Sequence, residues 1–420
     1  MACALGLWSS SALLIVPVVA LSGLLRHLVT YAQRLLPAAL RVALALWLLS
    51  LIQPPRLLVT LGEPQTVVTR NPLAGMHTLF VNEVEEWKIQ RGLAMIREMG
   101  APWVVEFLPW AYMEPRKGQY DWRSAERIIQ HANRQGIQLI ARLGFVPEWA
   151  RPDPNAQPTT FTYLDRDRYA DFAEFAAAFA AHFRGQIHHI IVWNEPNLAG
   201  EWGMRSVHPA GYVEMLRVVY PAIKQANPDV VVLAGALAPT LEPPGSAQGL
   251  NDLIYLERMY QALDAQSADQ SSIANPKSSI PNPKSKIESR PYDAWAVHTY
   301  GCTAPHDEPP APDRINFRRA ELLREIMARN GDEDVPVYIT ESGWNDDPRW
   351  MFAVTPAQRI AYTLGAWDYA RQHWPWARCV AVWVFKQPAP AYNYRDRYTF
   401  VTPSLEPLPI YEEVKKALAD

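Results

Sequence analysis

Short apolar runs alternate with helical patterns along most of the chain, from Met76 to the C-terminus. Such runs are typical of strands buried on both faces, and the stretch after each run carries apolar residues at helical spacing. The predicted strands cover residues 76–80, 103–107, 137–143, 187–192, 230–234, 293–298, 335–340 and 379–385. Eight such units in residues 76–420 predict an α/β fold, a (β/α)8 TIM barrel, more readily than an open doubly wound sheet.

Helix boundaries are marked by residues that favour helix ends. Gly100 and Gly136 follow the first two predicted helices, where glycine commonly ends a helix. Thr355 and Pro356 fit the N-cap and first position of the helix after the seventh strand. Phenylalanines 172, 175, 179 and 183 form a stripe on the third helix, which we interpret as core.

The alternation breaks between residues 265 and 290. The tetrapeptide Asn-Pro-Lys-Ser at 275–278 recurs at 282–285, in a run rich in serine, proline and lysine. Because this composition cannot bury an apolar face, we interpret the run as a disordered surface insertion within the barrel.

Residues 1–55 form a separate, strongly apolar segment. Residues 4–25 contain no charge and are long enough to cross a hydrocarbon core as a helix, and residues 35–52 form a second apolar run. The only charges before residue 56 are Arg26, Arg34 and Arg41, which the positive-inside rule would keep in the cytoplasm. We therefore predict a membrane anchor in residues 4–52, a linker over residues 56–75 and an extracytoplasmic barrel over residues 76–420.

A signal sequence is the alternative interpretation of the same segment. Arg34 and Arg41 would be its basic region and residues 42–52 its apolar core. Both interpretations place the barrel outside the membrane, either anchored or secreted.

The composition of the chain limits the kinds of ligand that it is expected to bind. The chain carries 16 Trp and 18 Tyr, and aromatic side chains are common at sugar sites, although most of these would fill a core. The net charge is −3 with no basic block in the barrel, so nucleic acid is not a predicted partner. The three cysteines lack the spacing of a disulfide framework or a metal site, and no metal or cofactor is predicted.

Two predicted strands end in a glutamate. Glu195 follows the fourth strand and Glu341 follows the seventh. The C-terminal ends of barrel strands share one face, where active sites lie, so both acids should meet there. Hydrolysis of a glycosidic bond needs two carboxyl groups, one to protonate the leaving oxygen and one to attack or to activate water. The distance between them decides between a retaining and an inverting reaction.

Other strand ends supply candidate substrate contacts. His298 and Tyr300 are two residues apart and share a face, so a Tyr300 hydroxyl could donate to Glu341 and lower the pKa of that carboxyl. Asn194 could bind the 2-hydroxyl of a sugar. The remaining candidates at or just past strand ends are Arg142, Trp110, Trp344 and Trp383. Packing inside the barrel is the alternative for Trp383, and a buried ion pair is the alternative for Arg142.

At these residues the chain resembles the clan of retaining glycoside hydrolases built on (β/α)8 barrels. The motifs are Trp-Asn-Glu-Pro at 193–196, Ile-Thr-Glu-Ser-Gly-Trp at 339–344 and His-Thr-Tyr at 298–300. The resemblance implies Glu195 as acid/base and Glu341 as nucleophile. It is strongest to the xylosidase/iduronidase-like and cellulase-like families, although Arg142 stands where cellulase-like members often place a histidine.

The sequence thus predicts a retaining glycoside hydrolase that cleaves an oligo- or polysaccharide by double displacement. One alternative is a catalytically silent, membrane-tethered carbohydrate-binding barrel. Another is a transglycosylase, because the same covalent intermediate serves transfer and hydrolysis.

Overall fold

The structure is a computed structural model that describes residues 23, 25–31, 38–51, 59–152, 159–274 and 290–419. The chain divides into two compact units, residues 1–60 and residues 61–420. Each unit is described by itself.

Eight parallel strands close into a barrel in the second unit, each paired with the strands before and after it in sequence. Their bounds are β1 (Ala74–Thr78), β2 (Trp103–Pro109), β3 (Gln138–Gly144), β4 (His189–Val192), β5 (Val231–Leu237), β6 (Ala294–Tyr300), β7 (Val337–Gly343) and β8 (Ala377–Val382). The predicted (β/α)8 fold is confirmed, and β1 and β8 pair to complete the closure.

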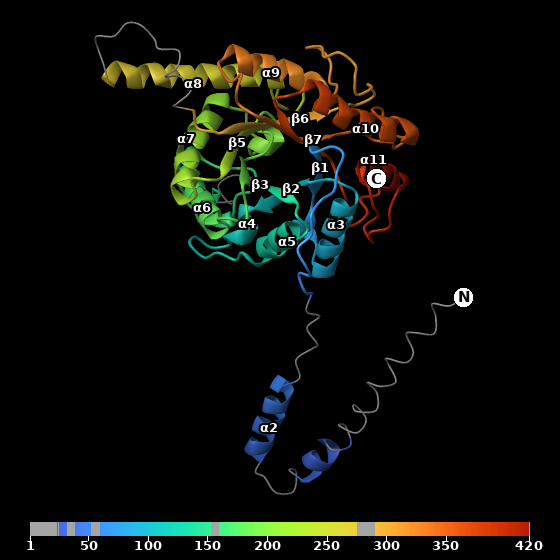
Figure 1. The fold of residues 1–420 in the computed structure, drawn as a ribbon. Coiled ribbons are helices and arrows are strands. Elements are labelled where there is room, and N and C mark those ends of the chain that lie inside the picture. The colour runs from blue at the N-terminus through green and yellow to red at the C-terminus, as the bar shows by residue number, and fades with distance from the viewer. Residues whose placement is uncertain are drawn as a thin grey trace. The chain divides into compact units, whose positions relative to one another are not determined.

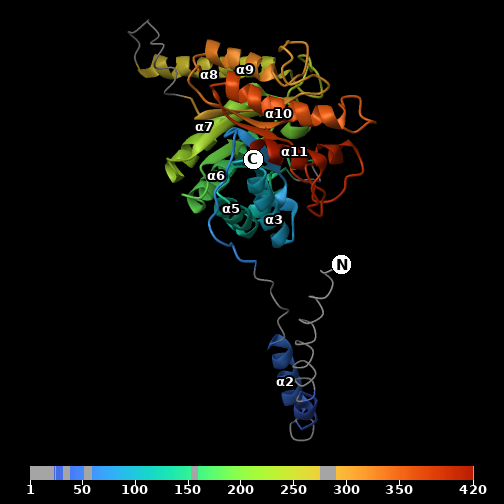
Figure 2. The ribbon, with the colours of Figure 1, turned by 45° about the vertical axis from the view of Figure 1, so that its right-hand side comes forward.

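Helices surround the strands, as Figure 1 shows. They are α3 (Glu86–Glu98), α4 (Trp110–Met113), α5 (Arg123–Arg134), α6 (Tyr169–His182), α7 (Pro209–Ala226), α8 (Asp252–Ala274), α9 (Arg319–Arg329), α10 (Pro356–His373) and α11 (Pro409–Leu418). Figure 2 brings α10 and α11 to the front of the barrel, where they pack against each other. The N-cap of α10 is Thr355, as predicted, and Gln358 completes a capping box with it.

Several predicted boundaries are shifted by a few residues. The first strand, predicted over residues 76–80, covers Ala74–Thr78, and the eighth, predicted over residues 379–385, covers Ala377–Val382. Helix α8 continues to Ala274 and so covers the beginning of the stretch predicted as a disordered insertion. The rest of that stretch, residues 275–289, lies outside the described residues.

The interior of the barrel is filled by alternate residues of the strands. This inner layer consists of Trp103, Val105, Ile140, Ile191, Leu233, Ala236, Ala294, Ala296, Tyr338, Cys379 and Ala381. Gly75 belongs to the same layer, because a Cβ atom there would lie 3.0 Å from Cys379 Sγ and 3.0 Å from Trp103 Cβ. Continued toward the strand ends, the alternation carries Arg142, His298 and Trp383 to the mouth of the barrel.

The outer layer lies between strands and helices. The predicted phenylalanine stripe of α6 is fully buried there, together with Trp110 and Trp193. Each face of the sheet is thus covered by apolar side chains, and polar side chains concentrate at the strand ends.

The first unit contains α2 (Ala38–Leu51), a helix of 14 residues. Among the residues that the structure describes, none of the helices combines the length and apolar character needed to cross a membrane. Of the predicted membrane segments, residues 4–22, 24, 35–37 and 52 lie outside the described residues.

Candidate active site

Glu195 is aimed by an unusual turn at the end of β4. Trp193 has a φ of 75° and Glu195 a φ of 39°, a region that non-glycine residues rarely adopt. The Glu195 amide donates to the Ala236 carbonyl at 3.0 Å, beside an irregularity in the register of β5. Such strained backbone persists only where the surroundings fix it, and it is common at functional sites.

Glu341 belongs to β7, and its side chain meets Glu195 at the mouth of the barrel. One oxygen of each carboxyl group and a ring nitrogen of His298 all lie within 4.8 Å of one another. Nδ1 of His298 lies 2.8 Å from Glu195 Oε1 and 3.7 Å from Glu341 Oε2. The predicted convergence of the two glutamates is therefore present, with His298 between them.

The Glu341 carboxylate is held by two donors. Arg142 Nη1 donates to Oε1 at 2.7 Å, and the Tyr300 hydroxyl donates to Oε2 at 2.7 Å. Burial alone would raise the pKa of Glu341, but His298, His77, Arg142 and the Tyr300 hydrogen bond outweigh it and lower that pKa to about 2. Glu341 is accordingly ionised at neutral pH, as a nucleophile must be.

His77 is a neighbour of this centre that the sequence analysis did not select. Its Nε2 lies 3.6 Å from Glu341 Oε1, and its ring packs against Trp383 with centroids 4.5 Å apart. Burial and the charge of Arg142 lower the pKa of His77 to about 3, so this ring is neutral at neutral pH. The alternation along β1 could have predicted His77, because it lies two residues after Gly75, which faces the interior of the barrel.

A cleft of about 1160 Å³ surrounds the two glutamates. Six of its lining residues come from the barrel mouth: Arg142, Asn194, Glu195, Tyr300, Glu341 and Trp383. Its outer walls come from the segments after β5, β6, β7 and β8. The cleft therefore has room for parts of a ligand that extend beyond the two glutamates.

Asn194 and Arg142 lie together, as the predicted site requires. Arg142 Nη1 donates to Asn194 Oδ1 at 2.7 Å, so one guanidinium nitrogen links Asn194 to Glu341. A buried ion pair was the alternative role for Arg142. Arg142 does form such a pair, and its partner is Glu341 of the site itself.

Three of the predicted substrate contacts, Trp110, Trp344 and His298, do not line the cleft, and His298 is buried between the two glutamates. Trp110 is 0% exposed and stacks on Phe175, because it begins α4 and turns into the outer layer. Trp344 is 2% exposed and donates its indole N–H to the Ala304 carbonyl at 2.7 Å. A Cβ atom on Gly301 would lie 1.9 Å from that indole, so the ring fills a closely fitted space. We therefore remove both tryptophans from the candidate binding residues.

Glu201 is a further carboxyl group of the cleft near Glu195, and it was not among the predicted site residues. Asn194 donates a side-chain hydrogen bond to it, and Trp193 Nε1 donates to its carbonyl at 2.8 Å. Burial, followed by the charge of Glu195, raises the pKa of Glu201 to about 7. It lies in the 3-10 helix Ala199–Trp202, a loop position with no periodic signal.

The two glutamates and His298 are also the one group in the described part of the chain with three potential metal ligands close together. Both oxygens of Glu341 already accept hydrogen bonds, one of them from the permanently charged Arg142. A guanidinium at this position repels a second cation. The donor set therefore fits an acid and nucleophile pair better than a metal site.

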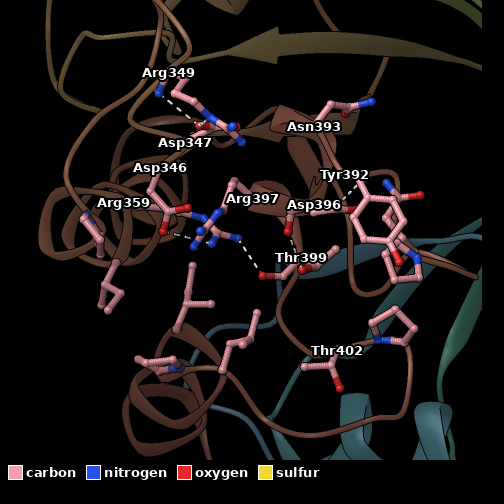
Figure 3. A pocket seen from close by; sticks show the side chains of 18 residues that line it. Asp346, Asp347, Arg349, Arg359, Tyr392, Asn393, Asp396, Arg397, Thr399 and Thr402 are labelled. Carbon is pink, nitrogen blue, oxygen red and sulfur yellow. Dashed lines mark hydrogen bonds and ion pairs between the residues drawn. The ribbon is translucent and has the colours of Figure 1, made fainter.

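A second hollow, of about 710 Å³, lies beside the start of α10 (Figure 3). Two of its charged groups, Arg359 and Asp396, already have structural partners. Arg359 Nη2 donates to the Thr399 carbonyl at 2.9 Å, and Asp396 accepts from the Ala391 and Tyr392 amides at 2.8 Å and 2.7 Å. We therefore assign the chemistry to the cleft that contains Glu195 and Glu341.

Comparison with known proteins agrees with this fold. A family model described as β-galactosidase, of glycoside hydrolase family 42, matches residues 79–162 of the 420-residue chain. No curated protein matches the sequence.

Several solved structures are similar. A family 39 glycoside hydrolase from Bacteroides cellulosilyticus WH2 has a TM-score of 0.61 and 20% identity, over 83% of this chain and 64% of that chain. The family 39 enzyme from Xanthomonas axonopodis pv. citri has a TM-score of 0.56 and 15% identity, over 86% and 71%. A family 5 protein from Streptomyces cattleya, solved with Manβ1-4GlcNAc, has a TM-score of 0.57 and 15% identity, over 82% and 80%.

This chain spans less than two thirds of the length of the Bacteroides protein. At these identities the likeness establishes the fold. The predicted resemblance to (β/α)8 glycoside hydrolases is confirmed at that level.

We predict that Arg142→Gln moves the acidic limb of the kcat/KM profile to higher pH. Glu341 must be ionised, and activity is lost as pH falls through its pKa of about 2. Removing the guanidinium removes one cause of the lowered pKa, so protonation begins at higher pH. The matched control is Arg314→Gln, because Arg314 also lines the cleft but pairs with Glu308. Equal profiles for both variants and the parent would contradict the assignment.

Proposed function

We propose that the protein is a retaining glycoside hydrolase that cleaves O-glycosidic bonds of an oligo- or polysaccharide. The observation that carries the proposal is the approach of the two carboxyl groups, with oxygens within 4.8 Å. Retaining enzymes place their carboxyl groups about 5–5.5 Å apart, and inverting enzymes about 6.5–9.5 Å apart to admit a water molecule. An oxygen-to-oxygen approach within 4.8 Å supports a carboxyl separation in the retaining range, which allows direct attack by one carboxylate.

In the first step, a Glu341 oxygen attacks the anomeric carbon while the Glu195 carboxyl donates its proton to the leaving oxygen. The bond to the leaving group breaks and a glycosyl ester with Glu341 forms. In the second step, the Glu195 carboxylate takes a proton from water, whose oxygen attacks the anomeric carbon. The ester bond breaks, Glu341 is released as a carboxylate, and the sugar keeps its original anomeric configuration.

The side chains around the two glutamates support Glu341 as nucleophile and Glu195 as acid/base. Arg142 and Tyr300 hold Glu341 ionised and oriented for attack, since each donates to a different oxygen. His298 binds Glu195 and so positions the acid over the reacting bond. Asn194, fixed by Arg142 on one side and by Glu201 on the other, keeps an N–H for the sugar 2-hydroxyl. Trp383 lines the same cleft and packs on His77, and we assign it to the floor of the subsite for the reacting sugar.

The sugar is best sought among β-linked glycosides. The Streptomyces protein was solved with Manβ1-4GlcNAc, and the matching family model is described as β-galactosidase. A panel of chromogenic β-glycosides, with acceptor sugars added in parallel, identifies the sugar and separates hydrolysis from transglycosylation.

We predict that the activities of the two glutamate variants depend differently on the leaving group, measured with glycosides of the sugar that the panel identifies. Glu341→Gln lowers kcat by about 10⁴-fold or more whatever the leaving group, because the nucleophile is lost. Glu195→Gln lowers kcat by about 10²–10⁴-fold with a poor leaving group and far less with dinitrophenolate, which needs no proton. Near-normal activity of Glu341→Gln, or the same leaving-group dependence in both variants, would contradict the proposed roles.

We propose in addition that residues 4–52 attach the chain to a membrane, with the barrel on the extracytoplasmic side. The support is the charge-free run 4–25 and the exclusively positive charges of residues 1–55. The full chain is then expected in the membrane fraction after an alkaline carbonate wash, and a fragment starting at residue 61 in the supernatant. Full-length protein in the supernatant would argue against an anchor, whereas a protein shortened at its N-terminus in the supernatant would favour the signal-sequence interpretation.

A further inference from the structure

The outer part of the cleft contains aromatic side chains that the catalytic steps do not use. Trp350 and Phe352 lie in the segment after β7, and Tyr394 lies in the segment after β8. Phe352 is 42% exposed and Tyr394 is 37% exposed, within a wall of the cleft. Exposed aromatic side chains gathered at one place commonly mark a binding surface.

The rings form one continuous wall. Trp350 and Tyr394 stack with centroids 4.9 Å apart and planes 10° apart, and Phe352 meets Trp350 edge-on at 5.4 Å. Tyr398 packs against Trp350 at 6.0 Å and against Tyr300 at 6.0 Å. Because Tyr300 donates to Glu341, the aromatic wall begins beside the nucleophile and leads away from it.

The two segments that carry the wall are held in place by backbone and side-chain hydrogen bonds. Asn345 Nδ2 donates to the Tyr394 carbonyl at 2.7 Å, which ties the segment after β7 to the segment after β8. The Asp396 carboxylate accepts from the amides of Ala391 and Tyr392, as Figure 3 shows for the bond to Tyr392. The rings are thus fixed before a ligand binds, so little conformational entropy is lost on binding.

We propose that Trp350, Phe352 and Tyr394 form a subsite for a second sugar ring, beyond the ring that occupies the catalytic pair. The apolar C–H face of a pyranose packs on such a surface, and its hydroxyls can bind polar groups that line the same cleft, such as Glu308 and Asp313. The substrate is therefore a chain of at least two sugar residues. This inference rests on the proposed function and specifies its substrate class.

The test compares, for each variant and the parent, a substrate with one sugar ring and substrates with several. A glycosyl fluoride places one sugar at the catalytic pair and has no second ring. Oligosaccharides of two to five residues, built from the sugar that the chromogenic panel identifies, extend onto the aromatic wall. We expect Trp350→Ala and Phe352→Ala to lower kcat/KM for the oligosaccharide by about tenfold, as the loss of one aromatic contact does, and to change the rate with the fluoride by less than about twofold.

The chain supplies a matched control. Met351 lies between the two aromatic residues and is 80% exposed, and it does not line the cleft. Met351→Ala should therefore leave both substrates unaffected. Thermal unfolding of each variant shows whether it is folded, and Phe352→Ala, at an exposed position, keeps the test open should Trp350→Ala fail to fold.

The possible outcomes distinguish a failure of the proposed subsite from a failure of the proposed hydrolysis. A selective loss with oligosaccharides supports the subsite. Equal losses with both substrates overturn it, because the wall would then support the catalytic centre through Tyr398 and Tyr300. Unchanged rates with both substrates overturn it as well, while the proposed hydrolysis stands. A parent protein that cleaves neither substrate class overturns the proposed function itself, and the subsite with it.

Discussion

The structure depends on keeping two carboxyl groups close together at the mouth of a barrel without letting their charges push them apart. Two ionised carboxylates with oxygens within 4.8 Å of each other repel strongly in a partly buried site. The two carboxyl groups have different surroundings, which reduces this repulsion. Glu341 receives the guanidinium of Arg142 and the hydroxyl of Tyr300, whereas Glu195 lies between His298 and a third acid, Glu201. Glu341 is thereby held ionised by two donors that Glu195 does not share, which suits Glu341 to the role of nucleophile.

The barrel makes this arrangement possible because inward-facing positions continue to the strand ends. Arg142 follows Ile140 on β3, and His298 follows Ala296 on β6, each two residues farther along the same face. A shift of one residue in either strand would turn the polar side chain into the outer apolar layer. The catalytic centre and the barrel core therefore depend on the same strand register. The strained turn at Trp193 and Glu195 is the place where the regular pattern is broken to aim the acid.

The strands, and with them the positions of both glutamates, could be predicted because buried strands have a strong apolar signal and their ends share one face. The same reasoning failed for Trp110, which follows a strand end but has the parity of the outward residues Val104 and Leu108. The last turns of helix α8, up to Ala274, fall in the stretch predicted as disordered, because their sequence is polar and has no apolar stripe that would indicate a helix. Glu201 and Trp350 lie in loop segments, where no periodicity relates a residue to the cleft, so three-dimensional structure was needed to find them.

The central claim is that Glu341 becomes covalently bound to the sugar while Glu195 transfers the proton. The most direct test is mass spectrometry of the protein after reaction with a 2-deoxy-2-fluoro glycoside that carries an activated leaving group and the sugar selected by the substrate panel. We expect one fluoroglycosyl group per protein, attached to the peptide that contains Glu341, and no adduct on Glu341→Gln. An adduct on Glu195, or turnover with inversion and no adduct at all, would contradict the account.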